Sequence, residues 1–308
     1  MKDLLLSVVI PTYNRKESLK RVLEAFNYQS ISFDEFEVVV VDDGSLDGTQ
    51  KLLDQLKSEL KYSLRNFYQQ HKGPSAARNL GIKEAKGEII LFLGDDIVPH
   101  KNLIEEHLKM HKDLPENIAV LGLVEWPPEV KKTPLMEYLD NGVQFSYSRL
   151  KGKTKADFNC FWTANISVKK SFLLKHGVFD EEFCYPAHED TELGYRLIKR
   201  GLEILYNPYA IGYNYHYVTL KSYIQKHIYI GRAIVKFSRK YPELPPHPDM
   251  KEVKKIFYWK YIKLPIAIGI LPFAYIFKIK KILFICYNVV LNYYKLKGIS
   301  MELKSKNL

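Results

Sequence analysis

Three short apolar runs, separated by amphipathic stretches, occupy the first hundred residues and constrain the fold more than any other feature. Each run lacks the polar alternation of a half-exposed strand, which is typical of strands covered on both faces. The stretches between the runs place apolar residues at helical spacing. This alternation predicts an α/β fold with a doubly wound, mostly parallel sheet. The predicted strands are residues 4–10, 36–41, 88–93 and, more weakly, 64–69, and the predicted helices are residues 15–29, 47–60 and 75–85.

Acidic pairs follow two of these runs. Asp42 and Asp43 come after the second run, and Asp95 and Asp96 come after the third. Because the carboxyl ends of parallel strands meet at one edge, where ligands bind, we expect these four side chains to lie close together. Four carboxylates repel one another, so a cation or a positively charged group should lie nearby. Oxygen ligands of this kind suit Mg²⁺ or Mn²⁺, although turn chemistry alone would also explain the first pair.

Two glycine-rich phosphate-binding motifs are absent from the sequence. It contains neither G-x-G-x-x-G nor G-x-x-x-x-G-K-[ST], which mark dinucleotide-binding folds and phosphate-binding loops. A phosphate group bound by this chain would therefore be handled through a metal ion rather than through a glycine-rich loop.

Beyond residue 117 the pattern loosens into a mixture of strands and helices. Residues 118–125 and 161–169 are predicted strands, and residues 190–199 are a predicted helix. We interpret this half as a mixed α+β part that completes the same domain. Hydrophobic residues make up 46% and charged residues 26%, so a disordered or fibrous chain is excluded.

The net charge of +11 is concentrated at the C-terminus. Residues 251–308 contain twelve lysines against Glu252 and Glu302, so the first 250 residues are almost neutral. Generic nucleic-acid binding would instead need a basic patch on the folded body. Two uncharged stretches, residues 264–277 and 282–294, fall short of the ~20 apolar residues that a spanning helix needs. Trp259, Tyr258 and Tyr261 lie among lysines, as in an interfacial aromatic belt.

These features predict a helical, basic and apolar C-terminal segment, residues 226–308, that associates with a membrane surface. The alternative is a pair of helices that pack on the catalytic part or on a second subunit. Residues 1–225 would form the catalytic domain, with a nucleotide-sugar-binding half over residues 1–115 and an acceptor-binding half over residues 116–225.

Four motifs in the first hundred residues resemble those of family 2 glycosyltransferases. They are Ser-Val-Val-Ile-Pro-Thr-Tyr-Asn-Arg (7–15), Val-Val-Val-Val-Asp-Asp-Gly-Ser (38–45), Gly-Pro-Ser-Ala-Ala-Arg-Asn-Leu-Gly-Ile (73–82) and Gly-Glu-Ile-Ile-Leu-Phe-Leu-Gly-Asp-Asp (87–96). The resemblance covers residues 5 to about 220. It implies a GT-A fold, an inverting mechanism, a nucleotide-diphosphate sugar donor and a divalent metal, Mn²⁺ or Mg²⁺.

The resemblance also implies donor-binding residues. Within the first motif Pro11 and Tyr13 would line the nucleotide base, and Asp43 would accept a hydrogen bond from it. Arg78 could pair with phosphate, or it could belong to a solvated helix face. The predicted donor-binding set is Pro11, Thr12, Tyr13, Asn14, Asp43, Arg78 and Asp95.

The implied metal site involves the third acidic motif and a later histidine. Asp95 would hold the ribose and Asp96 the metal. Gly94 stands where the family often has the first carboxylate of Asp-x-Asp, which leaves open which carboxylate binds metal. His216 follows a predicted strand and could be a further metal ligand, although a lone histidine among tyrosines is also typical of a structural residue.

The acceptor side is carried by two motifs of the second half. Phe-Trp-Thr-Ala-Asn (161–165) resembles the segment that borders the acceptor pocket, with Trp162, Thr163 and Asn165 as acceptor contacts. Trp162 could stack on a sugar or could belong to the core. In His-Glu-Asp-Thr-Glu-Leu-Gly (188–194) the resemblance makes Asp190 the general base and Glu189 the second candidate, whereas Asp190 could also simply begin a helix.

Together these interpretations predict an inverting glycosyltransferase of polysaccharide or glycolipid assembly. It would use a saccharide or lipid-linked acceptor and lie at the cytoplasmic face of the cell membrane. A sugar nucleotidyltransferase is one alternative, although it would normally carry a glycine-rich loop with Arg or Lys after the first strand. A non-catalytic nucleotide-sugar-binding protein is the other.

Overall fold

The computed structural model describes residues 4–140, 142, 145, 147–216, 218–245, 256 and 258–305. The chain divides into two compact units that interleave along the sequence. The first comprises Met1–Val130, Phe145–Cys184 and Glu189–His216, and the second comprises Lys131–Gln144, Tyr185–His188 and Tyr217–Leu308. The division of the catalytic part at residues 115 and 225 stays a prediction.

The first unit is built on one sheet with the strand order β3-β2-β1-β4-β8-β6-β9-β5, and β7 pairs with β9. β2 is parallel to β1 and β3, and β4 is parallel to β1, so the predicted parallel part is confirmed. The later strands are mixed, because β8 lies antiparallel between β4 and β6. The strands are β1 (Leu6–Thr12), β2 (Phe36–Asp42), β3 (Ser63–Tyr68), β4 (Ile89–Leu93), β5 (Ile97–Pro99), β6 (Ile118–Glu125), β7 (Lys155–Ala156), β8 (Asn165–Lys169) and β9 (Glu203–Asn214).

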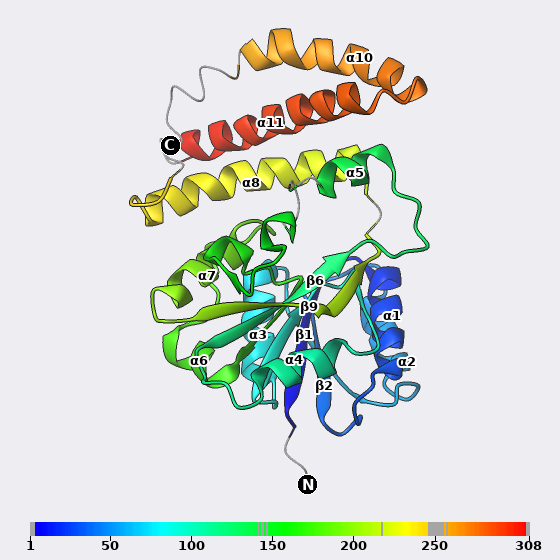
Figure 1. Ribbon diagram of the computed structural model, residues 1–308, viewed down its shortest axis with the longest axis vertical. Helices are drawn as coiled ribbons and strands as arrows, with labels where there is room; N and C mark the ends of the chain where they lie inside the picture. Colours follow the sequence, from blue (N-terminus) through cyan, green and yellow to red (C-terminus); the bar gives the residue numbers. More distant parts are fainter. Residues whose placement is uncertain are drawn as a thin grey trace. The chain divides into compact units, whose positions relative to one another are not determined.

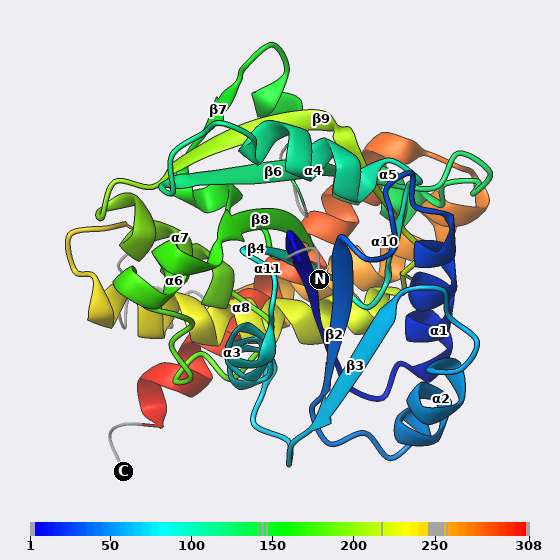
Figure 2. The same cartoon turned by 90° about the horizontal axis from the view of Figure 1, so that it is seen from below.

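Helices cover both faces of this sheet (Figure 1). Alternation along β1 explains how: Val8 and Ile10 pack with the leucines of α1, α2 and α4, whereas Val9 packs with residues of α3, α6 and α7 on the opposite face. Figure 2 shows α1 and α2 together on one side of β2 and α3 on the other. The helices are α1 (Lys16–Ala25), α2 (Thr49–Leu56), α3 (Pro74–Glu84), α4 (Leu103–His111), α6 (Lys170–His176) and α7 (Glu189–Ile198).

The second unit is helical, with α11 lying between α8 and α10 (Figure 1). A Cβ atom on Gly231 of α8 would meet the Lys295 carbonyl oxygen at 2.0 Å, and one on Gly298 of α11 would meet the Ile228 oxygen at 2.1 Å, so the two helices cross in backbone contact. Residues 246–255, 257 and 306–308 of the predicted tail lie outside the described residues. The elements are α5 (Pro134–Asp140), α8 (Leu220–Lys240), the π-helical turn η4 (Trp259–Lys263), α10 (Leu264–Ile276) and α11 (Lys280–Lys304).

Candidate active site

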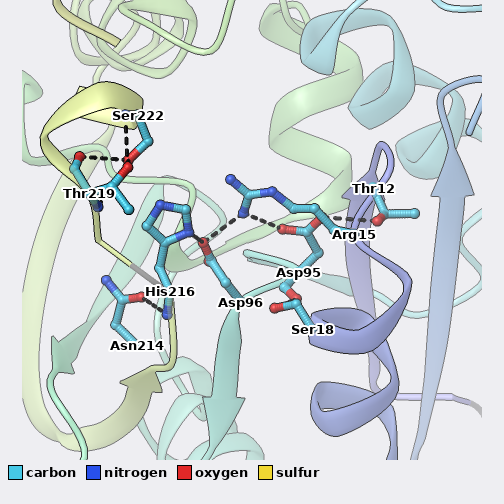
Figure 3. Close-up of polar contacts among 9 residues, drawn as sticks. All are labelled: Thr12, Arg15, Ser18, Asp95, Asp96, Asn214, His216, Thr219 and Ser222. Atoms are coloured by element: carbon cyan, nitrogen blue, oxygen red, sulfur yellow. Dashed lines mark hydrogen bonds and ion pairs between the residues drawn. The ribbon is translucent and has the colours of Figure 1, made fainter. Parts of the chain in front are cut away.

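The polar cluster at the end of β1 and β4 lies on the edge that the sequence predicts (Figure 3). The Thr12 hydroxyl, at the end of β1, donates a hydrogen bond of 2.9 Å to Asp95 Oδ2, just after β4. From α1, the Ser18 hydroxyl donates to the Asp95 carbonyl oxygen at 2.9 Å. Both strand ends are therefore joined through Asp95, whose side chain is buried.

Arg15 supplies the positive charge expected beside these carboxylates (Figure 3). Its Nη1 atom lies 3.0 Å from Asp95 Oδ1 and 2.7 Å from Asp96 Oδ2, so one guanidinium holds both side chains. We did not predict a role for Arg15 from the sequence, although it ends the motif 7–15. Its position between the end of β1 and the start of α1 was the available signal, because a residue there faces the strand-end edge.

The two carboxyl groups held by Arg15 have opposite pKa shifts. Burial raises the pKa of Asp95, and the nearby charge of Asp96 adds to it, against the charge of Arg15. Burial also acts to raise the pKa of Asp96, but the hydrogen bond from His216 and the charges of Arg15 and His216 outweigh it and lower that pKa. Asp96 is therefore the carboxylate that keeps its negative charge most firmly, as a cation ligand must.

His216 lies beside Asp96 (Figure 3). Its Nδ1 atom is 3.4 Å from Asp96 Oδ2. Two backbone contacts position the pair: the Asn214 amide oxygen accepts from the His216 N–H at 2.9 Å, and the Asp96 carbonyl oxygen accepts from the Tyr215 N–H at 2.9 Å. A Cβ atom on Gly94 would meet Asp96 Oδ1 at 2.9 Å, so glycine at this position leaves room for the Asp96 side chain.

The donor types at Asp96 and His216 fit a divalent ion. A carboxylate oxygen suits Mg²⁺ and Mn²⁺. The Arg15 guanidinium lies beside Asp96 Oδ2, so this carboxylate already contacts a positively charged group. Within the described ranges no group of three or more His, Cys, Asp or Glu side chains could hold a metal ion. The described side chains alone therefore supply too few ligands for such an ion, and other oxygen ligands would have to complete its coordination.

The first acidic pair is held by hydrogen bonds of its own rather than by Arg15. Asp42 Oδ1 accepts from the Ser45 N–H at 2.9 Å and Oδ2 from the Gln50 amide at 2.6 Å, which is the turn chemistry of the alternative interpretation. Asp43 is bound to the loop that follows β3: it accepts from the backbone N–H groups of Lys72 and Gly73, both at 2.9 Å. Nearby hydrogen-bond donors thus neutralise the repulsion at β2, and no shared ion is needed there.

Asp43 nevertheless organises the surroundings of Tyr13. His71 Nδ1 lies 2.8 Å from Asp43 Oδ2, and the His71 ring stacks on the Tyr13 ring with centroids 4.1 Å apart and an angle of 23°. The Tyr13 side of this stacked pair is open to solvent, because Tyr13 is 42% exposed. Asn14 follows with a φ of 52°, and its side chain accepts from the Leu46 N–H at 2.8 Å, which ties this turn to the one after β2.

Arg78 and Glu189 form a buried ion pair between α3 and α7. Arg78 Nη1 lies 3.0 Å from Glu189 Oε1, and both residues are more than nine-tenths buried, so the solvated-face interpretation of Arg78 is wrong. Burial raises the pKa of Glu189, the charge of Asp190 adds to this, and Arg78 opposes it. Asp190, in the first turn of α7, is less buried, and its Oδ1 accepts from the Thr191 N–H at 2.7 Å.

The residues predicted to contact the acceptor sugar are more deeply buried than such a contact requires. Trp162 is 9% exposed and packs against Tyr147, with ring centroids 4.9 Å apart, which favours the core interpretation. Thr163 is also buried. Asn165 is fully buried: its amide nitrogen donates to the Ala210 carbonyl at 2.8 Å, and its oxygen lies 2.9 Å from His107 Nε2. In this conformation Asn165 links β8 to the elements beside it, and an acceptor cannot reach it.

Comparison with known proteins identifies a family and a fold. The family model "Glycosyl transferase family 2" matches residues 7–183. The chain is similar to validoxylamine A glucosyltransferase of Streptomyces hygroscopicus subsp. jinggangensis, with 31% identity over 226 residues that cover 64% of this chain and 52% of that protein. It is similar to chondroitin synthase of Escherichia coli, with 28% identity over 64% of this chain and 32% of that protein. The chain thus spans about half the length of the first relative and about a third of the second.

Solved structures share the fold at low sequence identity. The mannosyltransferase PcManGT from Pyrobaculum calidifontis, in complex with GDP-Man and Mn²⁺, gives a TM-score of 0.67 at 19% identity, over 98% of this chain and 87% of that chain. TarS 1–349 of S. aureus, in complex with UDP, gives a TM-score of 0.54 at 16% identity, over 98% of this chain and 92% of that chain. These likenesses establish the mixed α/β fold of a GT-A glycosyltransferase and nothing about substrates.

Proposed function

Because its residues 7–183 match the family model, the chain belongs to glycosyltransferase family 2, and we propose that it is an inverting glycosyltransferase of polysaccharide or glycolipid assembly. It would move a sugar from a nucleotide-diphosphate sugar to an acceptor hydroxyl. The observation that carries the proposal is the cluster at the strand ends, where Asp96 faces His216 while Arg15 spans Asp95 and Asp96. Relatives that are named for glucosyl transfer and for chondroitin synthesis support it.

The donor nucleotide would bind along the turn of residues 11–14. The exposed face of Tyr13, backed by His71, offers a platform on which a nucleobase can stack. Asp43 would act chiefly by holding the loop that carries His71, since its oxygens already accept several hydrogen bonds from that loop. Pro11, Thr12, Asn14 and Asp95 complete the side of the site that receives the ribose.

Asp96 and His216 would hold a divalent ion together with the donor diphosphate. When bound, Mn²⁺ or Mg²⁺ neutralises the negative charge that builds on the departing diphosphate. Arg15, which contacts both Asp95 and Asp96, would add positive charge beside the diphosphate. The Mn²⁺ complex of the structural relative PcManGT supports this assignment.

Asp190 is the better candidate for the general base. Its neighbour Glu189 belongs to the buried ion pair with Arg78. Glu189 is held by Arg78 Nη1, whereas Asp190 Oδ2 accepts no hydrogen bond from the described residues. Asp190 would take the proton of the acceptor hydroxyl as the oxygen attacks the anomeric carbon. The bond from this carbon to the diphosphate breaks as the new glycosidic bond forms, so one displacement inverts the centre.

A thermal-shift screen of nucleotide sugars tests the donor proposal. Ligands that bind the folded state raise its stability by mass action, by ~2.7 kcal/mol at a concentration a hundredfold above Kd. We expect UDP or GDP sugars to raise the melting temperature more with Mn²⁺ than with EDTA, and sugar transfer to stop with EDTA. Transfer at an unchanged rate in EDTA would contradict the roles of Asp96 and His216. Release of pyrophosphate from NTP and sugar phosphate would instead support a nucleotidyltransferase.

We further propose that the second unit attaches the protein to a membrane, at its cytoplasmic face. Among the described residues one helical stretch, Trp259–Ile276, is long and apolar enough to cross a membrane by length and composition alone, and only 17% of it is buried. Within α10 the buried side is the narrow stripe Leu264, Ala267 and Ala274. The exposed side is apolar throughout its length, with Ile266, Ile268, Ile270, Phe273 and Ile276 all 40% or more exposed.

Lysines at both ends of this apolar face match anionic lipid headgroups. Lys263 lies 4.4 Å from the ring centroid of Trp259, and Lys278 and Lys280 follow α10. Each lysine near an anionic leaflet contributes ~1 kcal/mol. We expect the protein to sediment with vesicles that contain phosphatidylglycerol and to bind more weakly as salt increases or in pure phosphatidylcholine. Equal recovery in the supernatant with and without vesicles would contradict the attachment.

A further inference from the structure

The segment Tyr185–His188 stands out because it belongs to the second compact unit while its flanking residues, Cys184 and Glu189, belong to the first. The chain therefore leaves the sheet unit for four residues and returns to it at the first residue of α7. The next residue is Asp190. Whatever holds this short segment also determines where α7 begins, because only the peptide bond from His188 to Glu189 separates them.

Tyr185 is held by side chains of α8. Its ring stacks on that of Tyr229, with centroids 4.7 Å apart and an angle of 8°. The Arg232 guanidinium carbon lies 4.6 Å from the Tyr185 ring centroid, which is a cation–π distance. Arg232 is itself fixed by Glu302 of α11, since Nε lies 2.9 Å from a nearly buried carboxylate oxygen. The Tyr185 ring is thus clamped by two helices of the second unit, one directly and one through Arg232.

The end of the segment is held in a conformation that needs support. His188 has a φ of 62°, in the left-handed region that residues with a Cβ atom rarely adopt. Such a conformation persists only where the surrounding structure determines it, and it is concentrated at functional sites. The His188 ring lies 6.1 Å from that of Phe237, which is also on α8. Both ends of the segment therefore contact the same helix.

The first unit fixes the chain on either side of the segment. Before it, the Ser75 hydroxyl donates to the Phe183 carbonyl at 2.8 Å, and a Cβ atom on Gly73 would meet the Cys184 oxygen at 2.2 Å. After it, Arg78 binds Glu189 at 3.0 Å. α3 thus anchors the chain on both sides, and the Tyr185 contacts set the path of the four residues between these anchors.

We propose that Tyr185 is a positioning residue: its contacts with Tyr229 and Arg232 hold the segment 185–188 in the conformation from which α7, and with it the general base Asp190, begins. This inference rests on the proposed function for the role of Asp190, but the clamp itself is a statement about structure and is tested separately.

Hydrogen exchange of the full-length protein tests the clamp. In Tyr185→Ala and in Tyr229→Ala we expect faster amide exchange in peptides that cover residues 185–198, although Tyr229 is distant from them in sequence. Tyr185→Phe keeps the stacked ring and should exchange like the wild type. Tyr209→Ala removes a tyrosine that is 72% exposed on β9 and is the matched control. Wild-type exchange over residues 185–198 in both alanine variants would overturn the proposal.

Steady-state kinetics then separates positioning from mere stability. With UDP-glucose or GDP-mannose and Mn²⁺ as probes, we expect Tyr185→Ala to lower kcat ~10–100-fold with little change in donor KM, since misplacing a catalytic group has effects of this size. Tyr185→Phe should restore kcat. A loss confined to KM would overturn the positioning role. If the wild type turns over neither probe, the proposed function is in doubt while the exchange experiment still decides the clamp.

Discussion

The two units differ in which side chains they bury and which they expose. In the first unit charged groups are turned inward and satisfied: Glu37 is fully buried and accepts from the Ser7 hydroxyl at 2.7 Å and the Lys86 N–H at 2.6 Å. In the second unit apolar groups are turned outward along α10, and α8 has no acidic residue. Buried charge is costly unless it is paired, and exposed apolar surface is costly unless it is covered.

This contrast indicates a division of labour. In the first unit the buried carboxylates of Asp95 and Glu189 and the partly buried one of Asp96 contact arginines, and such groups are typical of a reaction site. The second unit carries a net charge of +14 over residues 218–308, more than the whole chain, together with an uncovered apolar face. Its composition suits attachment to a surface.

The largest effect should come from Asp190→Asn. Removing a positioned general base costs ~10²–10⁴ in rate, so we expect transfer to fall by this factor while nucleotide-sugar binding, measured by thermal shift, and vesicle binding stay as in the wild type. Asp113→Asn makes the same chemical change at an exposed position and serves as the control. Turnover at the wild-type rate in the Asp190 variant would remove Asp190 as the base.

Gly231→Ala should damage the second unit selectively. The new Cβ atom would stand 2.0 Å from the Lys295 carbonyl, and forcing atoms into such a crossing costs ~1–3 kcal/mol or more. We expect faster hydrogen exchange in α8 and α11 with unchanged protection in β1 and β4. Gly269→Ala is the matched control, since a Cβ atom there meets nothing within 4 Å and alanine favours the helix. Equal stability of the two variants would mean that α8 and α11 do not cross at these glycines.

Phe273→Asp should weaken vesicle binding while leaving donor binding intact, the reverse of the Asp190 variant. Phe273 is 53% exposed on α10, and an aspartate placed in the apolar region of a bilayer costs up to ~3 kcal/mol, so we expect a loss of about tenfold or more in partitioning. Leu46→Asp changes a residue that is 90% exposed in the first unit. If both variants lose the same affinity, the α10 face is not the attachment surface.

Much of the sheet could be predicted because buried parallel strands appear in the sequence as uninterrupted apolar runs. β6 begins and ends where the apolar pattern does. The helix α4 was missed for a physical reason: two of its four buried residues are His107 and His111, which look polar in a sequence pattern. Burial lowers their pKa to about 4 and about 3, so both are neutral, and each has one ring nitrogen 2.8 Å from the Ser167 hydroxyl oxygen. Among the described residues Nδ1 of His111 has no hydrogen-bond partner.

The residues of the site could be predicted better than the contacts between them. Strand-end placement brought Asp95 and Asp96 to one edge without any knowledge of side-chain direction, and only the resemblance to family 2 glycosyltransferases suggested His216. It could not show that Asp43 turns to the loop after β3, or that Arg15 turns to Asp95 and Asp96. Asn165 illustrates the same limit, because a strand residue that faces the interior and one that faces a pocket have the same spacing in the sequence.

The smallest expected effect sharpens the account of buried charge in the first unit. Burial and Asp190 raise the pKa of Glu189 in the folded state above its unfolded value near 4.5. The folded state then holds the proton more tightly, so the contribution of Glu189 to stability is full below that pH and declines as the pH rises through the folded pKa. We expect the wild type to lose stability relative to Glu189→Gln between pH 4.5 and 8 in urea unfolding, by about 1.4 kcal/mol for each unit by which the folded pKa of Glu189 exceeds 4.5. Parallel pH profiles of the two proteins would mean that Arg78 keeps Glu189 ionised throughout, and the buried pair would then be a simple ion pair.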